Sequence, residues 1–137
     1  MMYARFRYFA AKGTQLGYTI FLLLLLACPS HAGEWTKADT AREVAYLALH
    51  VVDWNQTLYI VDHPREFHEC NPILGSHPSR GEVNGYFIAT GLLHPLVSYG
   101  LKKYAPPGWS EAWQYITIGV ELGITAHNAS VGIGFGW

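Results

Sequence analysis

The fold is decided by residues 108–129, which read GWSEAWQYITIGVELGITAHNA. Polar residues recur there at intervals of four, three, four, four and three, so an α-helix places them on one narrow stripe: Ser110, Gln114, Thr117, Glu121, Thr125 and Asn128. Nearly every other residue of the stretch is aromatic, aliphatic or glycine. A surface helix of a water-soluble protein has the opposite pattern, an apolar stripe on a polar body. The stretch therefore predicts a helix surrounded by apolar material, with its polar groups turned toward partner helices, as in a lipid bilayer.

The composition of the whole chain agrees with this interpretation. The 137 residues are enough for one domain, half of them are hydrophobic, and only 14% are charged. Soluble domains average about 25% charged residues. A short chain has little interior in which to bury its apolar side chains, so we expect membrane lipid to cover them. The net charge of -1 gives no reason to expect a nucleic-acid partner.

Residues 1–32 have the layout of a secretory signal. A basic region is followed by an apolar run at 16–27 and then by small residues at the two positions that a signal peptidase reads, Ser30 and Ala32. Three outcomes stay open: cleavage after Ala32, retention as an uncleaved membrane anchor, and a lipid on Cys28, because Leu25-Leu26-Ala27-Cys28 resembles a lipobox. Each outcome directs the chain to the bacterial inner membrane or cell envelope.

The rest of the chain, residues 33–137, is predicted to form one helical membrane domain with helices at about 39–62, 82–104 and 109–130. Asp39 or Thr40 is the expected cap of the first helix, and Ser79 with Glu82 has the spacing of a capping box before the second. Pro64 and the Pro106-Pro107 pair are expected to end helices. The predicted fold is therefore all-α, a three-helix membrane-type bundle preceded by an N-terminal signal or anchor helix.

Four ionisable residues lie near the middle of these otherwise apolar helices: His50, Asp53, His94 and Glu121. Ionisable groups in such surroundings are costly unless paired, so the bundle should bring them together. His50 and Asp53 are three residues apart, at metal-ligand spacing, and the four could bind a divalent metal ion such as zinc, iron or manganese. Asp53 and Glu121 are also the candidates for general acid or base catalysis. The alternative is structural: buried Asp–His or Glu–His hydrogen bonds without any ligand.

Other polar residues are predicted to have structural roles. Gln114 and Asn128 should connect helices through hydrogen bonds. Glu69 and Asn71 should fasten the loop that contains them by bonding to backbone groups.

A short pattern links several of these residues. Asp53-x-x-x-Thr57 is followed by Glu69-x-Asn71-Pro72, and in this the chain resembles a group of small uncharacterised bacterial and phage-associated membrane proteins. The resemblance covers roughly residues 52–128 and departs from the group at 73–79, where the continuation is longer and more polar. It implies membrane-embedded helices and a linked set of Asp53, Thr57, Glu69 and Asn71. It implies no activity.

Three functional hypotheses follow. The first is a small integral membrane protein with a buried His/Asp/Glu cluster that packs the helices and binds an ion. The second is a membrane-embedded, metal-dependent hydrolase, although no nucleophile elbow, phosphate loop or HExxH motif occurs. The third is a lipid-tethered periplasmic interaction module. The expected partners are membrane lipid and either a second copy of the chain or another membrane protein.

Overall fold

The computed structural model describes residues 33–136, which form three α-helices: α2 (Lys37–Asp62), α3 (Arg80–Tyr104) and α4 (Trp109–Ser130). No strand occurs in this part of the chain, so the prediction of an all-α, three-helix fold is confirmed. The observed helices α2 and α3 begin two residues before the expected starts at 39 and 82. The expected signal or anchor segment 1–32, including Cys28, lies outside the described residues.

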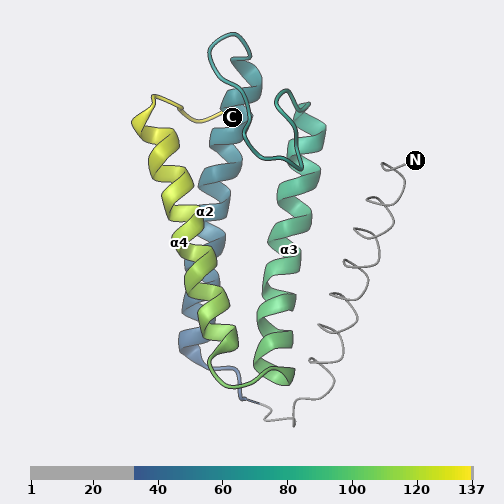
Figure 1. The fold of residues 1–137 in the computed structure, drawn as a ribbon, viewed down its shortest axis with the longest axis vertical. Helices are drawn as coiled ribbons and strands as arrows, with labels where there is room; N and C mark the ends of the chain where they lie inside the picture. Colours follow the sequence, from purple (N-terminus) through teal and green to yellow (C-terminus); the bar gives the residue numbers. More distant parts are fainter. Residues whose placement is uncertain (1–32, 137) are drawn as a thin grey trace, which may run out of the picture.

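The helices run side by side in an up-down-up arrangement, and α2 contacts both of the others (Figure 1). A short turn at 105–108 joins α3 to α4 at one end of the bundle. At the other end lie the long loop 63–79 between α2 and α3 and the C-terminal segment 131–136 (Figure 1). That segment returns to α2, where the Gly136 N–H donates to the Asn55 carbonyl at 2.9 Å. The loop end of the bundle is therefore built from all three helices and both irregular segments.

Both expected capping sites were tested by the structure. The prediction for α2 was wrong by three residues, because Thr36 is the cap and Asp39 completes its capping box from inside the first turn. An aspartate at either position can bond to free backbone N–H groups, so sequence could not separate the two registers. The capping box of Ser79 and Glu82 before α3 is confirmed.

The interior of the bundle is unusually polar. Its buried side chains include eleven polar or charged ones and six hydrophobic ones. The apolar cluster of Leu58, Val83 and Phe87 lies between α2 and α3. On α4 every buried residue is polar, and these are Ser110, Gln114, Glu121 and Thr125. Within residues 33–136, none of the helices combines the length and the average apolarity that a membrane crossing requires.

Candidate functional site

The polar stripe of α4 faces the other two helices, as its spacing predicted. The Ser110 hydroxyl donates to the Ser98 carbonyl on α3 at 2.9 Å, and the Gln114 amide donates to Glu43 on α2 at 2.7 Å. The Asn128 amide donates to both Asp53 (3.3 Å) and Gln56 (3.2 Å) on α2. The stripe is therefore a row of interhelical hydrogen bonds, and Gln114 and Asn128 have the connecting role expected of them.

Two buried histidine–carboxylate pairs occupy the middle of the bundle. His50 Nδ1 lies 2.7 Å from Glu121 Oε1, joining α2 to α4. His94 Nδ1 lies 2.8 Å from Glu43 Oε2, joining α3 to α2. All four residues are at most 9% exposed. Helix α2 is thus fixed to α4 and to α3, in each case by a short contact between two groups that could not be left unpaired in this interior.

The second nitrogen of each imidazole decides how protons are distributed. His50 Nε2 lies 3.1 Å from the Phe87 carbonyl, which can only accept, so Nε2 carries a proton. His94 Nε2 lies 2.8 Å from the Thr117 hydroxyl, whose own hydrogen points to the Trp113 carbonyl at 2.9 Å. Nε2 is therefore the donor in both rings. One proton then lies between each Nδ1 and its carboxylate, and each pair is electrically neutral as a unit.

Tyr46 connects the two pairs. Its ring stacks on His94 with centroids 3.5 Å apart and on His50 with centroids 5.2 Å apart. The Tyr46 hydroxyl lies 3.4 Å from His50 Nδ1, at the outer limit of a hydrogen bond. Gly91 of α3 adds to the closeness of packing, since a Cβ there would lie 3.4 Å from His50 Cδ2. The pairs and Tyr46 form one tightly packed unit.

This arrangement replaces the single cluster of His50, Asp53, His94 and Glu121 that the sequence suggested. Glu121 binds His50, but His94 binds Glu43 instead. In residues 33–136, no group of three or more His, Cys, Asp or Glu side chains has an arrangement that could hold a metal ion. Every imidazole nitrogen of the two pairs is already engaged in a hydrogen bond, so coordination would first have to break one. The structural alternative, a Glu–His hydrogen bond, is the one observed.

Glu43 and Tyr46 were not singled out from the sequence as members of the site. Glu43 lies in the second turn of α2, close around the helix axis to His50, Asp53 and Thr57. A usable signal was present, because Glu43, Tyr46 and His50 are spaced three and four residues apart and so share one helix face.

A second group of residues surrounds a cavity of about 820 Å³ at the loop end of the bundle. Asp53 and Thr57 reach it from α2 and Asn128 from α4, while Glu69 and Asn71 reach it from the loop. These include all four residues that the resemblance linked. Apolar side chains form much of the remaining wall: Ile60, Phe67, Ile73, Phe87, Ile124, Val131 and Ile133.

The loop over this cavity is fastened as predicted. Glu69 Oε1 accepts hydrogen bonds from the backbone N–H groups of Cys70 (2.8 Å) and Asn71 (2.7 Å). Asn71 Oδ1 accepts from the Ile73 N–H at 2.9 Å. The side chains of Glu69 and Asn71 therefore shape the cavity wall by holding the backbone of 69–73.

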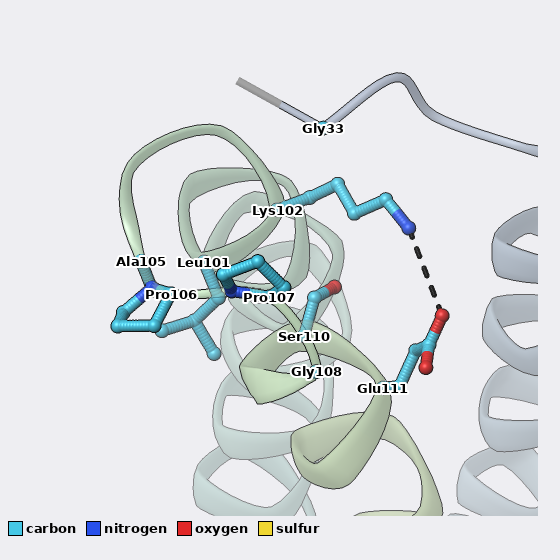
Figure 2. Close-up of a pocket in the computed structure, with 9 residues that line it drawn as sticks. All are labelled: Gly33, Leu101, Lys102, Ala105, Pro106, Pro107, Gly108, Ser110 and Glu111. Atoms are coloured by element: carbon cyan, nitrogen blue, oxygen red, sulfur yellow. Dashed lines mark ion pairs between the residues drawn. The ribbon is translucent and has the colours of Figure 1, made fainter. Parts of the chain in front are cut away.

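The opposite end of the bundle carries an ion-pair network around Asp39, whose side chain is fully buried. Thr36 donates to Asp39 through its backbone N–H and its hydroxyl, and Arg42 and Lys102 supply positive charge. Lys102 also lies 3.9 Å from Glu111 beside a cavity of about 410 Å³ at the turn between α3 and α4 (Figure 2). Every charged side chain that borders this cavity is an ion-pair partner, which gives the cavity a structural role.

A pH dependence of stability follows from Asp39. Burial alone would raise the pKa of its carboxyl group, but hydrogen bonds from Thr36 and the charge of Lys102 lower it from 3.8 to about 2. Because the pKa is lower in the folded state, the stabilisation is complete above about pH 4 and is lost as the pH falls toward 2. We expect a loss of about 2 kcal/mol over this range. Denaturation of the purified protein between pH 5 and 2 measures it, and the Asp39→Asn variant should lack this component. An unchanged pH profile in the variant would refute the assignment.

No model of a protein family, no curated protein sequence and no solved structure matches this chain. Its function is therefore argued from its own geometry.

Proposed function

We propose that the chain is a small integral membrane protein of the bacterial cell envelope, in which buried histidine–carboxylate pairs hold the helices together. The outward surface of the bundle carries this proposal. At positions 41–51 of α2, 85–99 of α3 and 112–126 of α4, every exposed residue is aliphatic, glycine or tyrosine. We call this surface the apolar girdle, and its residues are Ala41, Val44, Ala45, Ala48, Val51, Gly85, Ile88, Ala89, Leu92, Leu93, Leu96, Tyr99, Ala112, Tyr115, Ile116, Gly119, Val120, Leu122, Gly123, Ile124 and Ala126.

The girdle and the polar interior together make the bundle inside-out relative to a water-soluble one. In water, the exposed leucines and isoleucines of α3 and α4 would remain in unfavourable contact with the solvent. In a membrane, lipid covers them. The average apolarity of each helix is lowered by its inward-facing Asp, Glu, His, Gln and Thr residues, which lipid does not contact. Contact with lipid depends on the outward face of each helix, and within the girdle that face is apolar on all three helices.

The dimensions of the girdle are those of a short membrane segment. Fifteen helical positions on α3 or α4 extend about 21 Å, against about 30 Å of bilayer hydrocarbon. Tyr104 and Trp109 are exposed just beyond one edge, where aromatic side chains commonly meet the lipid headgroups. Local thinning of the bilayer accommodates a segment of this length. The resemblance to small membrane proteins agrees with this location.

The pairing of the histidines argues against the metal-dependent hydrolase among the sequence-based hypotheses. Both imidazoles are enclosed and hydrogen-bonded at both nitrogens, so neither faces a substrate. Asp53 is the one residue of the four suggested metal ligands that borders a cavity. Among these four residues, Asp53 is therefore the one at which we expect an ion or ligand to bind.

A charged substitution in the girdle tests the proposal. Leu92 is 67% exposed at the middle of α3, and a glutamate there would have to enter the bilayer, at a cost of about 2.5–3.5 kcal/mol on insertion scales. We expect Leu92→Glu in the full chain to lower sharply the fraction that resists carbonate extraction from membranes. Ile73→Glu is the matched control, since Ile73 is 77% exposed but lies in the loop.

The outcomes of this experiment separate the hypotheses. Loss of integration in the Leu92 variant alone supports a membrane-embedded bundle. Equal behaviour of both variants, with the chain released from membranes by carbonate, would overturn it in favour of the periplasmic module, whose girdle would then cover another protein surface.

A further inference from the structure

The cavity at the loop end of the bundle has a distinctive charge. Three carboxylates line it, Asp53, Glu66 and Glu69, and none of its lining residues is Lys or Arg. Among the ion pairs within residues 33–136, none involves these three groups. Burial, together with the nearby carboxylates of Glu121 and Glu69, raises the pKa of Asp53 to about 7. The cavity thus gathers three carboxyl groups beside two imidazoles, His68 and His127, and no lysine or arginine side chain is among its described lining residues.

The carboxylate of Asp53 has few hydrogen-bond donors around it. Asp53 is half-buried and its Oδ1 accepts one hydrogen bond, from the Asn128 amide at 3.3 Å. Close by on α4, Glu121 Oε2 is a buried oxygen without a hydrogen-bond partner in the described structure. A buried carboxylate with so few donors around it gains strongly from a cation that brings its own hydrogen-bond donors.

The apolar part of the wall restricts which cation fits. A hard metal ion requires several oxygen ligands in a closed shell, and no such group exists within residues 33–136. The wall instead combines the carboxylates with the faces or edges of Phe67 and Phe87 and with several isoleucines. Aromatic rings attract organic ammonium ions, and aliphatic side chains bury the carbon body of such an ion. A volume of about 820 Å³ lies in the range of small-molecule sites.

The geometry points to this cavity as a binding site for an ammonium ion carried on an apolar body, with Asp53 as the principal counter-ion and Glu69 as the second. The ammonium group donates to the Asp53 carboxylate, and the apolar body lies against Phe67, Phe87 and Ile124. The same chemistry is found in free arylalkyl amines and in the ethanolamine headgroup of a lipid. All the described walls of this site belong to the chain itself, and two of its lining residues, Gly123 and Ile124, also belong to the apolar girdle.

A titration with a matched pair of probes tests the site. The full chain, purified in a non-ionic detergent, is titrated at pH 7 with 2-phenylethylammonium and separately with neutral 2-phenylethanol, using calorimetry. We expect saturable binding of the ammonium ion and at least about tenfold weaker binding of the alcohol. Asp53→Asn keeps an acceptor for the Asn128 amide, so it should fold, and it should weaken ammonium binding by about tenfold or more.

Control variants and ions complete the experiment. Glu34→Gln removes one negative charge from an exposed residue outside the cavity and should leave the affinity unchanged. Circular dichroism checks that each variant is helical. Equal binding of ammonium and alcohol, an unaltered affinity in Asp53→Asn, or saturable binding of Mg²⁺ or Zn²⁺ in place of the amine would each overturn the proposal. Competition by phosphatidylethanolamine but not phosphatidylglycerol would identify a lipid amine as the occupant, and its absence a free amine.

Discussion

Replacing Glu43 with alanine is expected to lower the free energy of unfolding by about 3–5 kcal/mol, one of the two largest effects of any single substitution in the bundle. The carboxylate bonds to His94 at 2.8 Å and to Gln114 at 2.7 Å, and its side chain is 7% exposed. Its removal leaves Nδ1 of the buried His94 imidazole without a partner and takes from the Gln114 amide its shorter acceptor, leaving the Asp39 carbonyl at 3.2 Å. Water cannot easily replace the carboxylate there, so the desolvation cost of the Nδ1 group is incurred and the Gln114 bond is lost.

The Glu43→Gln variant is the control, because it keeps a hydrogen-bonding side chain at position 43. A glutamine at this position can accept from Gln114 through its oxygen and donate to Nδ1 of a neutral His94 through its amide. Because both contacts survive, we expect a loss of only about 1 kcal/mol. A double replacement by Glu43→Leu and His94→Phe removes both polar groups together and should recover much of the loss seen in Glu43→Ala.

Denaturation of the wild type, Glu43→Ala, Glu43→Gln and the double variant under the same conditions measures these differences. A loss below about 1 kcal/mol in Glu43→Ala would show that water or a rearranged side chain satisfies His94, and it would contradict the assignment of the pair as a main fastening of α2 to α3.

The three helices and the inward-facing stripe of α4 were predictable because both depend on local periodicity. Polar residues at helical spacing must lie on one face, and in a three-helix bundle that face has few alternatives to the other helices. The capping box at Ser79 was predictable for the same reason, since its two residues are neighbours in sequence. At Thr36 the same chemistry allowed two registers, and the structure uses the earlier one.

The choice of partners within the core was not predictable from the chain alone. Glu43, His50 and Asp53 all lie on the inner side of α2, one or two turns apart. A shift of α3 along α2 by one turn would change which carboxylate faces His94. That register is set by the summed packing of all three helices, and no single residue encodes it. Of the predicted four-residue cluster, His50 and Glu121 therefore form one pair, His94 is paired with Glu43 from outside the cluster, and Asp53 lies apart.

The cavity around Asp53 depends on segments without periodicity. Its walls include the loop 63–79 and the segment 131–136, whose paths are fixed by scattered backbone contacts such as the bonds from Glu69 and the bond between Gly136 and Asn55. The sequence pattern of Asp53, Thr57, Glu69 and Asn71 indicated that these residues belong together. It could not indicate that they surround an open volume.

Tyr46 packs against the histidines of both pairs. Replacing it with alanine is expected to lower the free energy of unfolding by about 3–5 kcal/mol. Its ring fills the space between His94 and His50 and is 6% exposed. Alanine would leave a void between the imidazoles of His94 and His50, because the Tyr46 ring is the group that stacks against both of them. Tyr46→Phe keeps the ring and removes only a hydroxyl 3.4 Å from His50, so its expected cost is below about 1 kcal/mol.

The NMR resonances of the two imidazoles show whether Tyr46 packs against both histidines or affects only one of them. In Tyr46→Ala the proton shifts of both His50 and His94 should change, because both rings lose the ring current of the stacked phenol, whereas Tyr46→Phe should preserve them. A change confined to one histidine would mean that the two pairs are independent, and an equal loss of stability in Tyr46→Phe and Tyr46→Ala would mean that the hydroxyl, and not the stacked ring, joins them. The stacking distances favour the ring, since 3.5 Å between the Tyr46 and His94 centroids is close contact and 3.4 Å from hydroxyl to nitrogen is a weak bond.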